Sequence, residues 1–192
     1  IEQLASLRAM PGMTLLRPGD ANEVVEAYRV ALGQKHRPAM LVLSRQPLPT
    51  LDRTKYAAAS GVAQGAYVLA DAAGGEPQVI LIASGSEVSL AVDAHETLAT
   101  EGIRSRVVSM PSWDLFERQP REYRDGVLPP HITARVAIEQ ASTFGWERYI
   151  GTRGRAIGME TFGASAPLKA LQQQFGFEPA HVVEVAKQVM AG

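Results

Sequence analysis

An arginine that follows an apolar run is the strongest candidate in this sequence for direct chemistry. Arg45 comes shortly after residues 39–43, whose continuous apolar character is typical of a strand buried in a parallel sheet. In open α/β sheets, ligands bind in the crevice beyond the carboxyl ends of the strands. There a planar guanidinium can donate two parallel hydrogen bonds to a phosphate. An ion pair with a neighbouring carboxylate is the alternative, and the residues around Arg45 leave both interpretations open.

The turn Ser84-Gly85-Ser86-Glu87 follows a second apolar run, residues 79–83, and precedes residues with helical periodicity. Backbone N–H groups at the start of a helix can hold an anion. The competing interpretation is a capping box, in which Ser84 is the N-cap and Glu87 reaches back to it. The second interpretation is favoured because the Glu87 carboxylate would repel a phosphate, and because neither GxGxxG nor GxxxxGK[ST] occurs in the chain.

The histidines and the absence of cysteine restrict the remaining chemistry. His36, His95, His131 and His181 do not occur at the spacing of a metal site. His95 falls within the apolar stripe of a predicted helix, so we expect it to pack against the core. A chain without cysteine has no disulfide, no thiolate metal ligand and no cysteine nucleophile.

The hydrophobic periodicity predicts strands that alternate with helices. This pattern indicates an α/β fold with an open, mostly parallel sheet flanked by helices, preceded by a fragment of a second α/β domain. Strands are predicted at residues 66–69 (an edge strand), 79–83, 106–110, 133–139 and 156–159, and helices at 88–101, 167–175 and 180–190. The preceding fragment is predicted to hold helices at residues 1–10 and 20–32 and strands at 13–16 and 39–43.

The second helix of that fragment carries further signals. Asp20 is its predicted N-cap, with Glu23 in the capping-box position. Its predicted apolar stripe consists of Val24, Val25, Tyr28 and Leu32.

Two prolines, Pro47 and Pro49, mark a linker because they cannot continue a helix or a central strand. We therefore divide the chain into residues 1–46, a linker at 47–65, and a second domain at 66–192.

Composition excludes several classes of function. Of the 192 residues, 46% are hydrophobic and 20% are charged, and the formal net charge is −1. This balance argues against a nucleic-acid partner and against an anionic membrane surface. No apolar run approaches the ~20 residues that a membrane-spanning helix needs. The aromatic residues Phe144, Trp146, Tyr149 and Phe162 cluster around glycines, and the segment Ser142–Tyr149 is interpreted as interface or interdomain packing.

The first residues, Ile1-Glu2-Gln3-Leu4-Ala5-Ser6-Leu7-Arg8, include no initiator Met and no signal-peptide features. They resemble the interior of a helix and not its first turn, so we expect the chain to be a fragment.

Five segments of the sequence, in this order, resemble transketolase, the thiamine-diphosphate enzyme of sugar-phosphate metabolism. They are Leu43-Ser44-Arg45-Gln46, Ala83-Ser84-Gly85-Ser86-Glu87-Val88, Arg106-Val107-Val108-Ser109-Met110-Pro111-Ser112, Ser142-Thr143-Phe144-Gly145-Trp146-Glu147-Arg148-Tyr149 and Thr161-Phe162-Gly163-Ala164-Ser165-Ala166-Pro167. The resemblance covers the whole chain and matches the end of the pyrimidine-binding domain plus the C-terminal domain.

The resemblance implies the activity of an intact enzyme. That enzyme would transfer a two-carbon ketol unit from a ketose phosphate to an aldose phosphate, using thiamine diphosphate and a divalent cation, Mg²⁺ or Ca²⁺. Arg45 occupies the place of the arginine that binds the substrate phosphate. No other site residue is carried over: we expect no catalytic, cofactor-binding or metal-binding residue in this chain, and no cofactor bound to it.

The resemblance also implies a homodimer, in which we expect this chain to support the dimer but to be inactive alone. The absence of cysteine fits a cytoplasmic location. Two other possibilities stay open on the sequence alone. One is the C-terminal domain of another thiamine-diphosphate enzyme, of the deoxyxylulose-phosphate synthase or pyruvate dehydrogenase beta type. The other is a free-standing, non-enzymatic α/β binding module.

Overall fold

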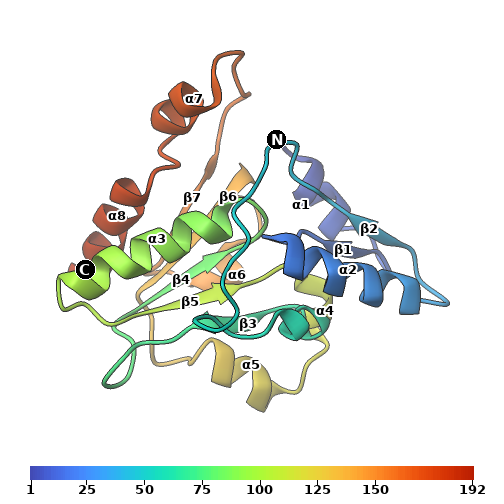
Figure 1. Ribbon diagram of the computed structural model, residues 1–192, viewed down its shortest axis with the longest axis horizontal. Helices are drawn as coiled ribbons and strands as arrows, with labels where there is room; N and C mark the ends of the chain where they lie inside the picture. Colours follow the sequence, from blue (N-terminus) through green and yellow to red (C-terminus); the bar gives the residue numbers. More distant parts are fainter.

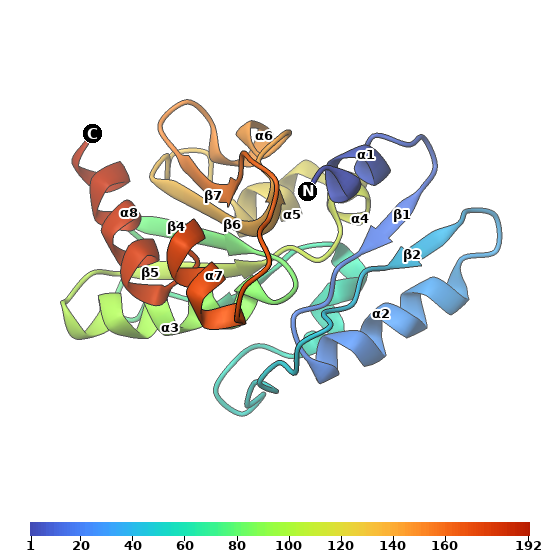
Figure 2. The ribbon, with the colours of Figure 1, turned by 90° about the horizontal axis from the view of Figure 1, so that it is seen from above.

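The computed structural model describes residues 1–192 and contains two β-sheets. The smaller sheet pairs β1 with β2 in parallel. The larger sheet has the strand order β3-β5-β4-β6-β7, in which β3 runs antiparallel to β5 and every other pair is parallel. Figure 2 shows the small sheet and α2 on one side of the molecule and the large sheet with its helices on the other. The predicted open, mostly parallel α/β fold is confirmed.

Figure 1 shows the elements in chain order. They are α1 (Gln3–Arg8), β1 (Thr14–Leu16), α2 (Ala21–Gly33), β2 (Ala39–Leu41), the 3-10 helix η1 (Ala59–Gln64), β3 (Tyr67–Ala70), β4 (Val79–Ala83), α3 (Glu87–Thr100), β5 (Ser105–Ser109), α4 (Trp113–Glu117), α5 (Arg121–Val127), β6 (Arg135–Ser142), α6 (Glu147–Ile150), β7 (Arg155–Met159), α7 (Leu168–Phe175) and α8 (Pro179–Ala191).

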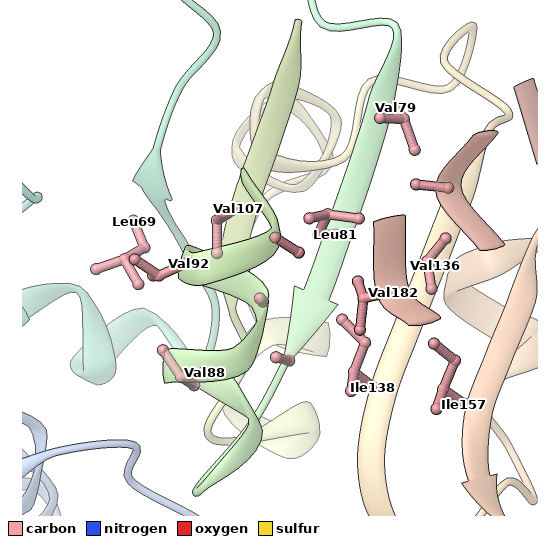
Figure 3. Packing of buried hydrophobic residues seen from close by; sticks show 14 of the residues in the cluster. Leu69, Val79, Leu81, Val88, Val92, Val107, Val136, Ile138, Ile157 and Val182 are labelled. Atoms are coloured by element: carbon pink, nitrogen blue, oxygen red, sulfur yellow. The ribbon is translucent and has the colours of Figure 1, made fainter. Parts of the chain in front are cut away.

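The central strand β4 is buried on both faces, as its continuous apolar run predicts. Successive side chains of a strand point to opposite faces. Leu81 therefore packs into the larger hydrophobic cluster, with residues of α3 and α8 (Figure 3), whereas Ile80 and Ile82 pack into a second cluster with residues of α4 and α6. The result is a three-layer arrangement in which helices cover both faces of the large sheet. No helix of the structure is both long and apolar enough to cross a membrane.

The first 46 residues are packed differently from what the sequence predicts. The prediction that β2 is a buried strand is wrong, since none of its residues is fully buried. Most of the predicted apolar stripe of α2 does not face the core either: Val25, Tyr28 and Leu32 are 52%, 49% and 82% exposed, and only Val24 is half-buried. Instead α2 turns Glu23 and Ala27 inward. The physical reason is that the small sheet has only two strands, so nothing in this chain covers the outer face of α2 and β2.

Candidate functional site

The carboxyl edge of the large sheet is where its polar side chains gather. Ser84 follows β4, Ser109 ends β5, and Glu139 lies on β6 just beyond the last residue of β4. The chain passes from β5 on one side of β4 to β6 on the other. Open α/β sheets bind ligands in the crevice at such a reversal of strand order. This edge is therefore the first place to look for a site.

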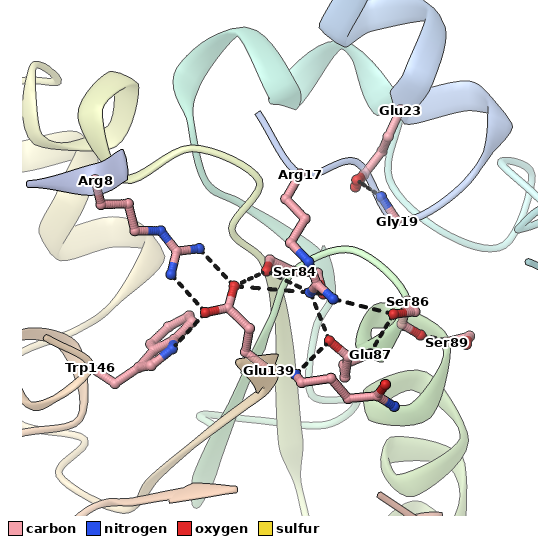
Figure 4. Close-up of polar contacts among 11 residues, drawn as sticks. Arg8, Arg17, Gly19, Glu23, Ser84, Ser86, Glu87, Ser89, Glu139 and Trp146 are labelled. Carbon is pink, nitrogen blue, oxygen red and sulfur yellow. Dashed lines mark hydrogen bonds and ion pairs between the residues drawn. The ribbon is translucent and has the colours of Figure 1, made fainter. Parts of the chain in front are cut away.

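Glu139 is tied to the first helix of the chain. Arg8 of α1 donates from Nη1 and Nη2 to the two carboxylate oxygens of Glu139, each over 2.6 Å. Ser84 Oγ and Trp146 Nε1 also donate to this carboxylate, over 2.5 and 3.1 Å (Figure 4). The Arg8 guanidinium in addition lies 4.0 Å from the centroid of the Trp113 ring. A fork-to-fork pair of this kind is the strongest geometry available to arginine and a carboxylate.

A second arginine, Arg17, enters the crevice directly after β1. Its Nη1 donates to the Ser84 carbonyl oxygen, to Ser84 Oγ over 3.1 Å and to Glu87 Oε2 over 2.7 Å. Glu87 Oε2 also accepts the backbone N–H of Gln140 over 2.9 Å, and Ser86 Oγ donates to Glu87 Oε1 over 2.5 Å. Figure 4 shows how Arg8 and Arg17 approach Glu139 from two sides. The crevice is thus filled by charged side chains of this chain itself.

The capping-box interpretation of residues 84–87 is wrong. The N-cap of α3 is Ser86, and no side chain caps the helix. Glu87 is 1% exposed and accepts hydrogen bonds from Arg17 and Gln140. The nearby arginine offers Glu87 a charged partner, which outcompetes a neutral backbone N–H. Because Glu87 already neutralises Arg17, the turn presents no free cation to an anion.

A third buried carboxylate closes the crevice at β5. Glu23 of α2 accepts hydrogen bonds from Tyr67 Oη and Ser109 Oγ, each over 2.6 Å, and from the Gly19 N–H over 2.7 Å. The predicted N-cap is confirmed, since the Asp20 side chain accepts from the Glu23 N–H over 2.8 Å. The capping box is completed one residue away from its predicted position, at Gly19 instead of Asp20.

The two carboxylates Glu139 and Glu23 have pKa values shifted in opposite directions. Burial alone would raise the pKa of Glu139, but the hydrogen bonds and charge of Arg8, with the charge of Arg17, hold it below its ordinary value. Glu23 has hydroxyl and N–H donors but no cation in direct contact, and burial raises its pKa. The ion pair therefore stabilises the anionic form of Glu139, whereas burial destabilises the anionic form of Glu23 relative to its neutral form.

Arg45 lies apart from this network. It is exposed, four residues beyond β2, and it makes no hydrogen bond or ion pair with any residue of the chain. The alternative interpretation of Arg45, a pair with a neighbouring carboxylate, is thus not realised here. Its neighbours Ser44 and Gln46 line a cavity of about 260 Å³. The other residues around this cavity are Pro18, Asp20, Ala21, Val24, Leu43 and Leu48.

The histidines and aromatic residues are separated by the fold. His95 is half-buried on α3 with its Nδ1 2.8 Å from Ser105 Oγ, and burial lowers its pKa. Trp146 and Tyr149 are buried and pack edge-on against Trp113, with ring centroids 4.8 and 5.0 Å away. Of the two interpretations, interface or interdomain packing, these two buried residues fit packing within the chain and not a subunit interface. Phe144 and Phe162 are the exposed members of the set.

Comparison with known proteins identifies the family. A family model described as the transketolase-like C-terminal domain matches residues 65–178, and one described as the transketolase pyrimidine-binding domain matches residues 1–50. Transketolase of Halalkalibacterium halodurans is 54% identical over 190 residues, which cover 99% of this chain and 28% of that relative. The chain belongs to the transketolase family.

Solved transketolase structures have the same fold over the entire chain. The structure of the Leishmania mexicana enzyme superposes with a TM-score of 0.91 at 41% identity, covering 100% of this chain and 27% of that one. Transketolase from Pichia stipitis in complex with sedoheptulose 7-phosphate gives a TM-score of 0.88 at 38% identity, again over 100% and 27%. The chain thus spans about 28% of the curated relative's length.

The residues of this chain do not by themselves fit the metal of a transketolase. No group of three or more His, Asp or Glu side chains is placed to hold an ion. The buried carboxylates at the sheet edge already accept hydrogen bonds from arginines, hydroxyl groups or backbone N–H groups. A cation there would compete with two guanidinium groups, so no chemical step is assigned to a cofactor held by these residues alone.

Proposed function

We propose that the protein to which this chain belongs transfers a two-carbon ketol unit between sugar phosphates with thiamine diphosphate and a divalent cation. A ketose phosphate would be shortened by two carbons to an aldose phosphate, and an acceptor aldose phosphate would be lengthened by the same unit. Membership of the transketolase family supports this proposal, together with the pyrimidine-binding domain match at residues 1–50.

The role of this chain in that reaction depends on Arg45. We assign it to the phosphate of the sugar-phosphate substrate. Two features support the assignment: Arg45 stands within Leu43-Ser44-Arg45-Gln46, and its guanidinium is exposed with no partner in the chain. An uncommitted arginine beyond a parallel strand is well placed to receive a phosphate.

We further propose that the chain alone is inactive and acts as scaffold and dimer support within a cytoplasmic homodimer. The division into residues 1–46, 47–65 and 66–192 belongs to the same proposal. The two separate sheets, joined through Pro47, Pro49 and η1, support that division. The outer face of α2, where Tyr28 and Leu32 are exposed, would then be covered by the rest of the protein.

The direct test is an assay of the full-length protein loaded with thiamine diphosphate and Mg²⁺, with a ketose phosphate donor and an aldose phosphate acceptor. Mass spectrometry should detect one product shorter by two carbons and one longer by two. Absence of transfer by verified, cofactor-loaded protein would refute the function. The 192-residue chain, assayed in parallel, should show none, and transfer by that chain would refute its scaffold role.

A further inference from the structure

The segment that carries Arg45 is held only at its two ends. Residues 43–50 form no regular secondary structure and make no backbone–backbone hydrogen bond. At the first end, the Val42 N–H donates to the Leu16 carbonyl oxygen over 2.8 Å and continues the pairing of β2 with β1. At the second end, the Leu51 N–H donates to Asp20 Oδ2 over 3.0 Å. The position of Arg45 therefore depends on these two attachments.

Asp20 makes the second attachment with an unusually full set of contacts. It is 2% exposed and accepts from the Glu23 N–H, the Leu51 N–H, Asn22 Nδ2 and Arg53 Nη2, the last over 2.9 Å. One carboxylate thus fixes the start of α2 and the far end of the Arg45 segment together. Arg53 in turn donates to the Ala57 carbonyl oxygen over 2.8 Å and to Tyr67 Oη over 3.0 Å.

The turn Gly19-Asp20, the base of the Arg45 segment, is closely packed. A Cβ added at Gly19 would lie 2.7 Å from Val88 Cγ2 and 3.0 Å from the Gly85 carbonyl oxygen, so this turn packs directly on the start of α3. The cavity of about 260 Å³ lies between this base and the loop residues Leu43, Ser44 and Gln46. Figure 2 shows the chain leaving β2 and passing the start of α2. The loop lies beside this cavity, and its backbone is hydrogen-bonded only at its two ends.

We infer that Asp20 and Arg53 are positioning residues, which form a clasp that holds Arg45 where it meets the substrate phosphate. This inference rests on the phosphate-binding role proposed for Arg45. Asp20 is too deeply buried to touch the substrate and acts through Leu51 and the segment that precedes it. Releasing the clasp should weaken recognition of the phosphate and spare the rest of the reaction.

The test uses the full-length enzyme with phosphorylated donors and with hydroxypyruvate, which has no phosphate. Asp20→Asn keeps an N-cap oxygen for Glu23. It replaces the oxygen that accepts the Leu51 N–H with an amide nitrogen, which cannot accept it, and it removes the charge that faces Arg53. It should lower kcat/KM for phosphorylated donors about tenfold or more, mainly through KM, because a misplacement of roughly 1 Å can cost about a hundredfold. With hydroxypyruvate, the loss should stay within about twofold. If the Asp20 variant does not fold, Arg53→Gln is used instead, and the same selective loss of kcat/KM for phosphorylated donors is expected.

A double-mutant cycle separates positioning from a merely structural role. Added to Arg45→Ala, Asp20→Asn should cause no further loss with phosphorylated donors, since residues that act through one contact are not additive. Equal losses for both substrate classes, additive losses in the Arg45→Ala background, or no loss at all would each overturn the clasp. Arg29→Gln, which removes an exposed ion pair with Glu26 on the same helix, is the control and should change neither substrate.

Failure of the clasp is distinguishable from failure of the proposed function. If Arg45→Ala is selective for phosphorylated donors and Asp20→Asn is not, only the clasp is wrong. If Arg45→Ala is not selective, the phosphate role and the clasp are both overturned.

Discussion

Arg8 and Glu139 lie 131 positions apart in the sequence, yet two hydrogen bonds of 2.6 Å join their side chains in the protein interior. Their side chains are 7% and 1% exposed. The pair fastens the first helix to the centre of the large sheet, at the edge where α/β proteins usually bind ligands. In this chain, that edge of the large sheet is bound by side chains from the first 23 residues, namely Arg8, Arg17 and Glu23.

Glu139→Gln should destabilise the chain strongly. Removing one partner of a buried ion pair leaves an uncompensated charge, at a cost of about 3–5 kcal/mol. Urea unfolding followed by tryptophan fluorescence is a suitable measurement, because Trp146 donates to Glu139. The control is Asp125→Asn, which breaks an exposed pair with Arg121 on α5 and should cost less than about 1 kcal/mol. Similar losses in the free energy of unfolding for Glu139→Gln and Asp125→Asn would contradict a stabilising role of the buried Arg8–Glu139 pair.

Acid should weaken the ion pair between Arg8 and Glu139. The pKa of Glu139 is lower in the folded protein than its ordinary value of 4.5. Its contribution to stability is therefore present above that ordinary value and is lost as the pH falls through the folded pKa. The free energy of unfolding, measured between pH 6 and pH 3 in the parent and in Glu139→Gln, should fall less steeply in the variant. Parallel curves would show that Glu139 does not titrate with folding.

Glu23 should act in the opposite sense. Burial raises its folded pKa above 4.5, so the stability it contributes is present below that value and is lost as the pH rises through the folded pKa. A single group of this kind lowers the free energy of unfolding by up to about 1.4 kcal/mol per pH unit within that window. Glu23→Gln should remove this decline, as seen by unfolding at a series of pH values from 4 to 8. A variant that retains the full decline would point to another group.

Two features, the capping box at residues 84–87 and the apolar stripe of α2, are predicted incorrectly from the sequence. The continuous apolar residues of β4 were enough to predict a central strand, because burial on both faces leaves a local signature. The role of Glu87 cannot be predicted in this way, because its partner Arg17 follows a strand of the other sheet, 70 positions away in the sequence. Arg17 directly follows β1 and Arg45 comes shortly after β2, and this shared pattern is the one signal that could have identified Arg17 from the sequence. Periodicity alone places Leu32 on an apolar face, but it cannot reveal whether another element covers that face, and Leu32 is exposed.

Gly65 should tolerate alanine much less well than Gly102, although both have a positive φ, of 85° and 76°. A Cβ at Gly65 would lie 2.2 Å from the Phe116 backbone nitrogen and 2.4 Å from the Ser112 carbonyl oxygen, whereas nothing lies within 4 Å at Gly102. Gly102→Ala should therefore cost only the conformational strain, about 1–2 kcal/mol. Gly65→Ala should cost a further 1–3 kcal/mol, roughly the penalty of overpacking. Equilibrium unfolding of both variants tests the difference, and equal costs would show that the turn before β3 can shift.

Arg45 is proposed to be the phosphate-binding arginine of a ketol transferase. The decisive measurement compares kcat/KM of the full-length Arg45→Ala variant for a ketose phosphate and for hydroxypyruvate. Loss of a charge-assisted contact worth roughly 1.5–3 kcal/mol should lower the value for the ketose phosphate by about 10- to 150-fold. The value for hydroxypyruvate should change little, as should both values in Arg37→Ala, which removes another exposed arginine. An equal loss for both substrates in Arg45→Ala would contradict the account.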